Sequence, residues 1–461
     1  MKKSRSEQVA NWYSRYFPDA FIFALVLTII AMLLSLFLTE SSVGEVMDHW
    51  FAGFPWLFEF AFQLMFTYAA ALVLVDTPVV QKYVKKTANL VKTPMTAYVT
   101  TSVVGALTSF IGWYIGPVVT AIFARSVGRE IPGVDYRLIS AIAYSSFTIS
   151  LTGISGTIPL FVATEGEFTD VIGGIVGLEQ TTFSTLNIVS AIAIIITTTI
   201  IYMVIAKNKT DIVTFHDLAT PEFKAAEEQA GAVDPDESNV SVEEIEEKSF
   251  ADKVNTFRPL ILIVGIVGLV YLIYFLGREG LGGLNLNTVA FIALVMGLLV
   301  QKDAVSYARS FSKNLIATGS IGLQFPIYGG IASILVGTGL AATITDAIVS
   351  VSTEVTFPVL AFLTTGLLNL FVPSAGSQFT ATATFWMPAA ETLGVDSIRT
   401  IMAITYGDIW TNLIQPFWAL LYFPILAVGT NLKVRDFMGY CLPVLIAVGV
   451  IWILSLLFLP V

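Results

Sequence analysis

Hydrophobic positions recur along the chain in long runs that are separated by short polar stretches. An α-helix needs about 20 apolar residues to cross the hydrocarbon core of a bilayer, and the runs have this length. The alternating pattern of an outer-membrane β-barrel is absent. The sequence therefore predicts an all-α polytopic membrane protein, with continuous helices at about Phe21–Leu38, Leu57–Val75, Ile188–Ala206, Pro259–Leu276, Thr288–Val300, Asn314–Val336 and Tyr440–Leu459.

Four further apolar segments are interrupted by proline, glycine and polar residues, at Gly112–Pro117, Thr152–Pro159, Leu370–Trp386 and Gly407–Pro416. Proline removes a backbone donor and glycine relaxes the backbone, so an unbroken helix is not expected at these places. In lipid, a broken backbone is tolerated where it is buried in protein or lines a wet cavity. Taken alone, the Leu370–Trp386 break fits a packed kink and a binding site equally well.

The distribution of Lys and Arg predicts the orientation, because cytoplasmic loops are enriched in these residues. The basic N-terminus is expected in the cytoplasm, and the loops Thr39–Trp56, Glu165–Asn187 and Gly337–Val355, which lack Lys and Arg, are expected outside. Arg399 is an exception, since its loop is also expected outside. This orientation predicts that Gly112–Val127 and Leu370–Trp386 belong to re-entrant helical hairpins of opposite orientation.

The segments on either side of an acidic stretch follow the same order with opposite orientation. Ala143-Tyr144 aligns with Thr405-Tyr406, and each pair precedes an interrupted polar segment. Paired interrupted segments in inverted halves are typical of secondary transporters and mark their binding sites. We therefore predict two inverted-topology repeats, each with a re-entrant hairpin and an interrupted helix. Their arrangement is a first transmembrane repeat at 1–206, an acidic cytoplasmic linker at 207–258 that is expected to be a solvated tether, and a connector helix plus the second repeat at 259–461.

Composition excludes several classes of function. With one cysteine and two histidines, the 461 residues hold no intrachain disulfide and favour neither a thiol metal cluster nor haem. No phosphate-binding loop and no nucleophile–base pair is present, so we expect neither an enzyme nor a cofactor. The net charge of −10 arises mostly in the linker, where Lys207–Arg258 holds 13 acidic and 6 basic residues. It therefore says little about the transported species, and no nucleic-acid partner is expected.

Polar residues at depth supply the candidate site. The half-helix that begins near Ser377 points its N–H dipoles at the break, which suits a carboxylate. Asp408 lies within an apolar segment, and a buried carboxylate without a basic partner nearby could bind H⁺ or Na⁺. Composition alone allows a monocarboxylate, a dicarboxylate or an amino acid. The candidate substrate-binding residues are Asn369, Ser374, Gly376, Ser377, Gln378, Thr380, Asn412, Gln415, Gln324 and Ser155, with Asp408 as the ion-coupling residue.

Several stretches resemble the bacterial short-chain fatty acid transporter family, which is associated with acetoacetate and butyrate use. They include Leu323–Tyr328, Val372–Gly376, Ala403–Gly407, Gln415–Ala419 and Val434–Cys441. The resemblance spans nearly the whole chain and is most specific in the second half. Two positions depart from the family pattern, because Asp408 stands where Glu is common and Gly112 stands where Asn, the counterpart of Asn369, is expected.

The resemblance implies uptake of short-chain fatty acids across the bacterial inner membrane, within an ion-transporter superfamily built on inverted repeats. Asp408 makes H⁺ or Na⁺ the expected coupling ion. It also makes a homodimer plausible. The alternative is a dicarboxylate or other organic-anion or cation exchanger of the same superfamily.

Overall fold

The structure is a computed structural model that describes residues 4–16, 18–75, 77, 91–113, 115–163, 172–225, 249–280, 286–316 and 318–461. Within these residues the chain is helical, and its β-type pairing is limited to one isolated bridge between Ala219 and Thr430. The prediction of an all-α protein is thus confirmed. The side chains of Ser377 and Thr380 lie outside the described part, so these two candidates cannot be placed.

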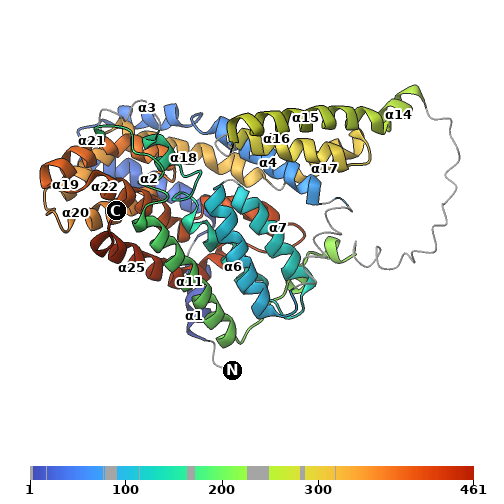
Figure 1. Cartoon of the computed structure of the whole chain (residues 1–461), viewed down its shortest axis with the longest axis horizontal. Coiled ribbons are helices and arrows are strands. Elements are labelled where there is room, and N and C mark those ends of the chain that lie inside the picture. The colour runs from blue at the N-terminus through green and yellow to red at the C-terminus, as the bar shows by residue number, and fades with distance from the viewer. Residues whose placement is uncertain are drawn as a thin grey trace.

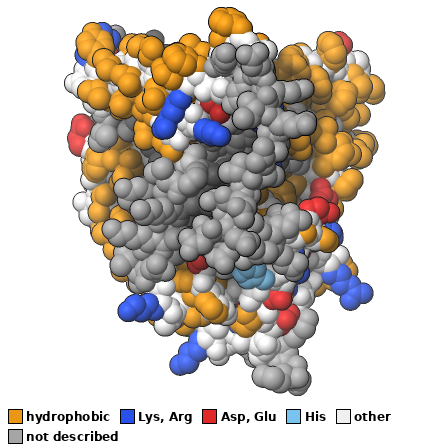
Figure 2. Space-filling model, turned by 90° about the vertical axis from the view of Figure 1, so that its right-hand side faces the viewer, with side chains coloured by type: hydrophobic (Ala, Val, Ile, Leu, Met, Phe, Trp, Pro, Cys, Tyr) orange, Lys and Arg blue, Asp and Glu red, His pale blue; other side chains and the backbone are white. Residues whose placement is uncertain are grey.

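Five of the described helical segments are long and apolar enough to cross a membrane. Helix α15 is the most exposed of them, with only 22% of its most apolar 18 residues buried. On the face shown in Figure 2, hydrophobic side chains cover much of the visible upper part. Exposed apolar surface of this extent is typical of contact with lipid, in agreement with a multi-pass membrane protein. The five segments are α2 (Ala20–Leu38), α11 (Thr185–Asn208), α15 (Arg258–Glu279), α18 (Gly319–Gly337) and Val434–Phe458, which ends in α25 (Leu442–Phe458).

Local capping residues determine where several helices begin. Asp19 accepts a hydrogen bond from the amide of Phe21 at the start of α2. Asp135 and Asp396 do the same for α8 (Tyr136–Ser145) and α22 (Ser397–Trp410). An N-cap carboxylate satisfies an amide that would otherwise lack a partner in the first turn.

The helices form a main body and an arm (Figure 1). The arm contains α15, α16 (Leu286–Val300) and α17 (Ala304–Ile316), which pack on one another and on α4 (Phe58–Val75). Helix α4 also contacts α18, so it joins the arm to the body. The body holds both hairpins and both interrupted helices.

The two hairpins differ in how tightly they close. Helices α6 (Pro94–Ile111) and α7 (Ile115–Glu130) pack along each other and turn at Gly112–Trp113. Helix α20 (Phe357–Asn369) instead packs chiefly on α22, and α21 (Ala375–Leu393) packs on α22 and α19 (Leu340–Val349). Pro117 stays inside α7, because proline is tolerated in the first turn of a helix.

Both interrupted helices are broken close to the predicted places. Helix α8 passes into a short 3₁₀ turn, Ser146–Ile149, and helical structure resumes at α9 (Thr157–Val162). Helix α22 passes into a short 3₁₀ turn, Thr411–Leu413. Helical structure resumes at a second 3₁₀ turn, Trp418–Leu421, and continues at α23 (Phe423–Leu426). The second break therefore begins at Thr411, not at Gly407 as predicted. A Cβ at Gly407 would lie 2.4 Å from the carbonyl oxygen of Phe362, so this glycine allows close helix packing rather than a break.

Three predictions about continuous helices and loops were wrong. The predicted loops at Thr39–Trp56 and Gly337–Val355 contain α3 (Val43–Gly53) and α19. A capping box between Ser42 and Glu45 starts α3. Helices α3 and α19 are both too short to appear in the sequence as an apolar run of membrane-spanning length. The predicted helix Asn314–Val336 is two helices, since α17 ends at Ile316 and α18 begins at Gly319.

The first part of the predicted linker is packed rather than solvated. Residues 207–225 lie against the ends of α7 and α8: the amide of Tyr136 donates to the carbonyl of Val213 at 2.7 Å. The Arg129 guanidinium lies 5.3 Å from the centre of the Phe223 ring. The expectation of a solvated tether therefore fails for this part, and residues 226–248 lie outside the described residues.

Candidate functional site between the hairpin tips

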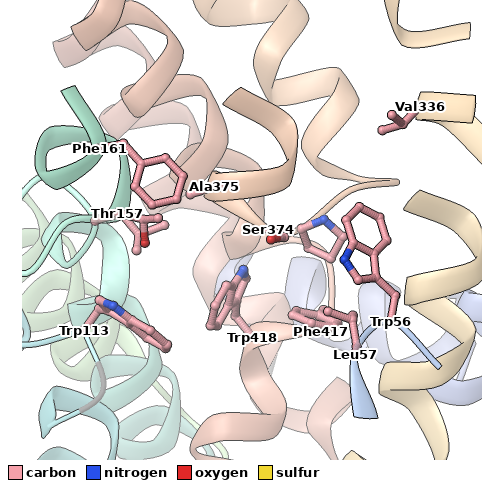
Figure 3. A pocket seen from close by; sticks show the side chains of 13 residues that line it. Trp56, Leu57, Trp113, Thr157, Phe161, Val336, Ser374, Ala375, Phe417 and Trp418 are labelled. Atoms are coloured by element: carbon pink, nitrogen blue, oxygen red, sulfur yellow. The ribbon is translucent and has the colours of Figure 1, made fainter. Parts of the chain in front are cut away.

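The tips of the two hairpins meet at one cavity of about 510 Å³. The first hairpin contributes Trp113, and the second contributes Pro373 through Gly376 (Figure 3). The interrupted helices add Leu151, Thr157 and Phe161 within and after the first break, and Phe417 and Trp418 after the second. The lining residues are Trp56, Leu57, Trp113, Leu151, Thr157, Phe161, Val336, Pro373, Ser374, Ala375, Gly376, Phe417 and Trp418.

The lining is mostly apolar and aromatic, and its polar side-chain groups are the hydroxyls of Thr157 and Ser374 and the indole N–H groups of three tryptophans. None of the lining residues is acidic or basic. The rings of Trp113 and Trp418 meet edge to face with their centres 5.7 Å apart, so the first hairpin and the second break share one wall. Such a cavity suits a small molecule that carries both an apolar part and a hydrogen-bonding group.

Helix α21 begins at the cavity. Ser374 is its N-cap residue, in an extended conformation, and the amides of the following first turn point out of this end of the helix. These amides and the helix dipole favour a negative charge at this end. A Cβ at Gly376 would lie 3.2 Å from the Phe161 ring, so a larger residue here would narrow the cavity.

Asn369 and the second break form a hydrogen-bonded group behind this wall. The Asn369 amide nitrogen donates to Asn412 Oδ1 at 2.7 Å and to Thr411 Oγ1 at 3.0 Å. Gln415 Nε2 donates to the same Asn412 oxygen at 2.9 Å, and Gln415 Oε1 accepts from the amide of Phe417 at 2.8 Å. This group ties α20 to the break and holds Phe417, a lining residue, in place.

Asp408 lies on α22 one turn before this group and is 1% exposed. Its Oδ1 atom is buried and has no hydrogen-bond partner among the described residues. Two nearby elements also hold buried acceptors of this kind, Asn369 Oδ1 on α20 and Gln378 Oε1 on α21. Unpartnered oxygens at depth are costly, and protons or cations are the species that they can bind.

The remaining predicted residues lie apart from the cavity lining. Gln378 is turned toward α20 and donates to the carbonyl of Thr365 at 2.7 Å. Ser155 Oγ accepts from the amide of Trp113 at 3.0 Å and so joins the first break to the first hairpin tip. Gln324 is buried on α18 with an unpartnered Oε1. Of the candidates whose side chains are described, Ser374 lines the cavity, as does Gly376, and Asn369, Asn412 and Gln415 form the group behind it.

Two tyrosines that served only to align the two halves of the sequence reach toward the breaks, one directly and one through Asn187. The Tyr144 hydroxyl donates to the carbonyl oxygen of Asn412, and the Tyr406 hydroxyl donates to Asn187 Oδ1 at 3.3 Å. Both side chains are fully buried. Their place directly before each interrupted segment was visible in the sequence, but their partners were not.

Comparison with known proteins gives the family. The model of the family described as "Short chain fatty acid transporter" matches residues 1–459. The chain belongs to the short-chain fatty acid transporter family. This confirms the resemblance and the prediction that the protein is a transporter and not an enzyme.

The protein is similar along its length to two named bacterial members of the family. It is 34% identical over 451 residues to an Escherichia coli (strain K12) protein named "Putative short-chain fatty acid transporter", with 98% of each chain covered. A Haemophilus influenzae protein with the same name is 32% identical over 462 residues, which cover 98% of this chain and 99% of that one.

Two solved structures align with the transporter at low identity. MtrF of Neisseria gonorrhoeae, described as illuminating a class of antimetabolite efflux pumps, aligns over 98% of this chain and 96% of its own, with a TM-score of 0.42 and 13% identity. The YdaH transporter of Alcanivorax borkumensis aligns over 95% of this chain and 98% of its own, with a TM-score of 0.41 and 13% identity.

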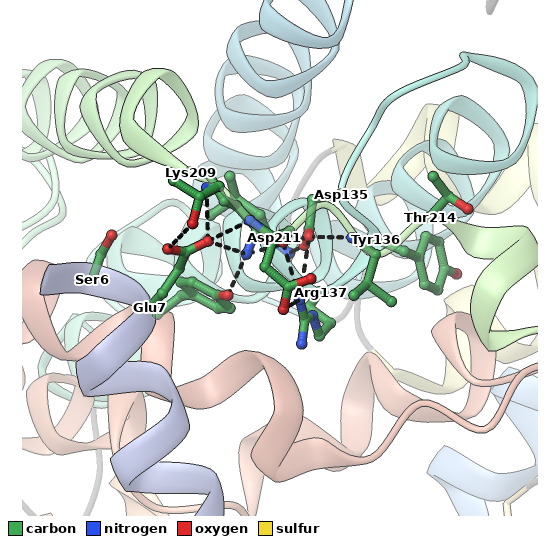
Figure 4. Close-up of polar contacts among 12 residues, drawn as sticks. Ser6, Glu7, Asp135, Tyr136, Arg137, Lys209, Asp211 and Thr214 are labelled. Carbon is green, nitrogen blue, oxygen red and sulfur yellow. Dashed lines mark hydrogen bonds and ion pairs between the residues drawn. The ribbon is translucent and has the colours of Figure 1, made fainter. Parts of the chain in front are cut away.

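A charged cluster that sequence analysis did not predict lies at the N-terminal end of α8 in the transporter (Figure 4). The Lys209 side chain is fully buried, and its ammonium lies 3.3 Å from Asp135 Oδ2, 4.0 Å from Glu7 Oε1 and 2.5 Å from the Tyr440 hydroxyl. Arg137 also contacts Asp135, at 3.6 Å. The cluster joins α1 (Arg5–Tyr16), the packed linker and the start of the first interrupted helix.

Glu7 is held as a carboxylate in this cluster. It accepts hydrogen bonds of 2.7–2.9 Å from the amides of Ser4, Thr210 and Asp211 and from the Thr210 hydroxyl. Burial alone raises the pKa of Glu7, but these hydrogen bonds outweigh burial and lower it to about 2. Burial lowers the pKa of Lys209, against the opposing effect of Asp135. The carboxylate of Glu7 therefore fixes the position of the packed linker.

Proposed function

We propose that the protein is a secondary active transporter that carries short-chain monocarboxylates, such as butyrate and acetoacetate, across the cytoplasmic membrane of a bacterium. The carrying observation is the mostly apolar cavity between the two hairpin tips, with the start of α21 in its lining. Membership of the family supports the class of substrate. The N-terminus lies in the cytoplasm in this proposal, as the distribution of Lys and Arg predicts.

The cavity suits the two ends of a short-chain acid. The carboxylate binds at the first-turn amides of α21 and the Ser374 hydroxyl, where no charged side chain has to be desolvated. The alkyl chain packs against Phe161, Trp113 and Trp418. A four-carbon acid occupies roughly 100 Å³, on the order of three water molecules' share of liquid volume, so the acid and some water fit together.

A dicarboxylate is the second candidate, and the lining disfavours it. A second carboxylate would need its own donors at the far end of the cavity. On the side where the alkyl chain would pack, Thr157 offers a single hydroxyl beside the indole N–H groups of Trp113 and Trp418, and no lining residue is Lys, Arg or His. Burying an unpaired charge against such a surface is expensive.

Asp408 provides the coupling site in this proposal. A carboxylate with an unpartnered oxygen at depth binds either a proton or Na⁺, and the acceptors Asn369 Oδ1 and Gln378 Oε1 are on helices that pack with α22 or flank the same tip. Oxygen acceptors suit both H⁺ and a hard cation. Binding of the ion at this group would set the position of the second break and, through Phe417, the cavity wall.

Uptake by purified protein in proteoliposomes tests the function. Labelled butyrate should accumulate when an inward pH or Na⁺ gradient is imposed. Unlabelled acetoacetate should compete, and succinate should not. Ser374→Ala should raise the KM for butyrate, whereas Ser350→Ala, at an exposed serine after α19, should leave uptake unchanged. Stronger competition by succinate than by acetoacetate would support the dicarboxylate alternative.

A further inference from the structure

Each interrupted helix carries an arginine and a tyrosine at the same spacing. In α8 these are Arg137 and Tyr144, and in α22 they are Arg399 and Tyr406, seven residues apart in both cases. Arg137 Nη2 donates to the carbonyl of Asp211, just beyond the end of α11, at 3.3 Å. In each interrupted helix, the arginine anchors the first turn, and the tyrosine seven residues later precedes the break.

Arg399 makes the equivalent contact in the second half. Its guanidinium donates to the carbonyl of Leu456 and, at 2.9 Å, to that of Leu459, at the end of α25. In each half, the interrupted helix thus begins beside the C-terminal end of the next long helix. This contact also explains why an arginine is present in a loop that is otherwise free of basic residues, since carbonyls at a helix C-terminus favour a cation.

Tyr144 reaches out of the first half into the break of the second. Its hydroxyl donates to the carbonyl of Asn412 and lies 3.4 Å from that of Gln415. Its ring meets the ring of Tyr422 edge to face, at 5.5 Å between centres. Both carbonyls belong to the segment where α22 loses its regular helical hydrogen bonds.

Tyr406 reaches in the opposite direction. Its hydroxyl donates to Asn187 Oδ1 at 3.3 Å, and the Asn187 amide nitrogen donates to the carbonyl of Thr152 at 2.9 Å and to that of Thr182 at 2.8 Å. Thr152 lies in the first break. The Tyr406 ring stacks on Trp452 at 5.0 Å, which fixes the direction of the hydroxyl.

We propose that Tyr144 and Tyr406 form a reciprocal brace, in which the tyrosine before each break positions the broken backbone of the other half. Tyr144 contacts the second break directly, and Tyr406 acts on the first break through Asn187. The proposal names two positioning residues for transport, and it rests on the proposed function in so far as the broken segments shape the substrate cavity.

The brace has a physical reason. A broken helix leaves carbonyl oxygens without their usual amide donors, and water cannot replace those donors inside the bilayer. A donor from the opposite half satisfies the carbonyl only while the two halves keep one relative position. Leu151, within the first break, and Thr157, directly after it, line the cavity, as do Phe417 and Trp418 after the second break. Loss of either hydroxyl should therefore displace cavity walls without removing a residue that touches the substrate.

Hydrogen–deuterium exchange tests the brace independently of the substrate. Tyr144→Phe should raise exchange at 411–416 more than at 151–156, and Tyr406→Phe should do the reverse. Tyr98→Phe is the matched control, because this buried hydroxyl contacts the backbone of Asp135 within the first half. Tyr98→Phe should leave hydrogen–deuterium exchange at both breaks unchanged. Equal exchange in wild type and both variants, or a rise confined to the mutated half, would overturn the proposal.

Uptake kinetics test the role in transport. Tyr144→Phe and Tyr406→Phe should each raise the KM for butyrate at least five-fold, with a thermal midpoint that stays within the range of Tyr98→Phe. Asn187→Ala should reproduce the effect of Tyr406→Phe. An unchanged KM in both tyrosine variants would refute the positioning role. If wild-type protein takes up no butyrate, the proposed substrate is wrong, and the exchange pattern still decides on the brace.

Discussion

Replacing Glu7 by glutamine should destabilise the folded protein at neutral pH and leave it almost unaffected in acid. The substituted side chain would keep one oxygen acceptor but lose the charge and the second oxygen. Glu7 is 2% exposed and accepts four hydrogen bonds, three of them from backbone amides. The packed linker would lose its attachment to α1.

The size of the effect follows from the pKa of Glu7. The usual value is 4.5 and the folded value is about 2. A fall of this size corresponds to about 3 kcal/mol of extra stability for the folded state with the carboxyl ionised. Because the folded pKa is the lower one, this stability is fully present above pH 4.5 and is lost as the pH falls from about 4.5 toward 2.

Thermal unfolding in detergent between pH 7 and pH 3 measures the effect. The midpoint of Glu7→Gln should lie well below that of wild type at pH 7, and the gap should narrow below about pH 4.5. Glu222→Gln, at an exposed glutamate of the same packed segment, should match wild type throughout. A gap that is absent at pH 7, or that stays constant down to pH 3, would refute the assigned hydrogen bonding.

Three further substitutions test other contacts. Lys209→Met removes the buried partner of two carboxylates and should cost about 3–5 kcal/mol, whereas Lys207→Met, at an exposed position, should cost little in the same unfolding assay. Asp408→Asn should abolish gradient-driven accumulation of butyrate but preserve exchange of internal for external butyrate, and Asp346→Asn, at an exposed position of α19, should affect neither. Persistent accumulation in Asp408→Asn would show that Asp408 is not the coupling residue. Gly407→Ala forces a Cβ against a carbonyl oxygen of α20 and should destabilise by about 1–3 kcal/mol, and an unchanged midpoint would contradict this packing.

Local chemistry explains which parts of the fold were predictable. Clusters of proline, glycine and polar residues in an apolar run disfavour a continuous helix, so the positions of the breaks were predicted to within a few residues. Single prolines do not have this effect here, since Pro326 and Pro388 lie inside α18 and α21. Helices α3 and α19 were missed because their caps and short amphipathic patterns are weaker features than a membrane-length run. Gly407 was misinterpreted because close packing on α20 is a tertiary property that no local pattern reveals.

For the candidate site, too, local features could be predicted from the sequence and tertiary contacts could not. Ser374 and Gly376 line the cavity, since they belong to the tip itself. Asn369 and Gln378 are turned into helix contacts instead, because a buried amide takes the nearest available partner. Lys209 was assigned to a solvated linker, although its charge is buried by groups from three distant parts of the chain.

Protection from thiol labelling tests most directly whether the substrate binds between the hairpin tips. Cys441 is buried, so it should contribute little background. Ala375→Cys adds a thiol to the cavity lining and keeps the first-turn amides of α21. Butyrate should slow labelling of this thiol by a methanethiosulfonate reagent, succinate should not, and labelling of Ser350→Cys should be unaffected by either acid. Undiminished labelling of Ala375→Cys at butyrate concentrations that saturate its uptake would contradict the account.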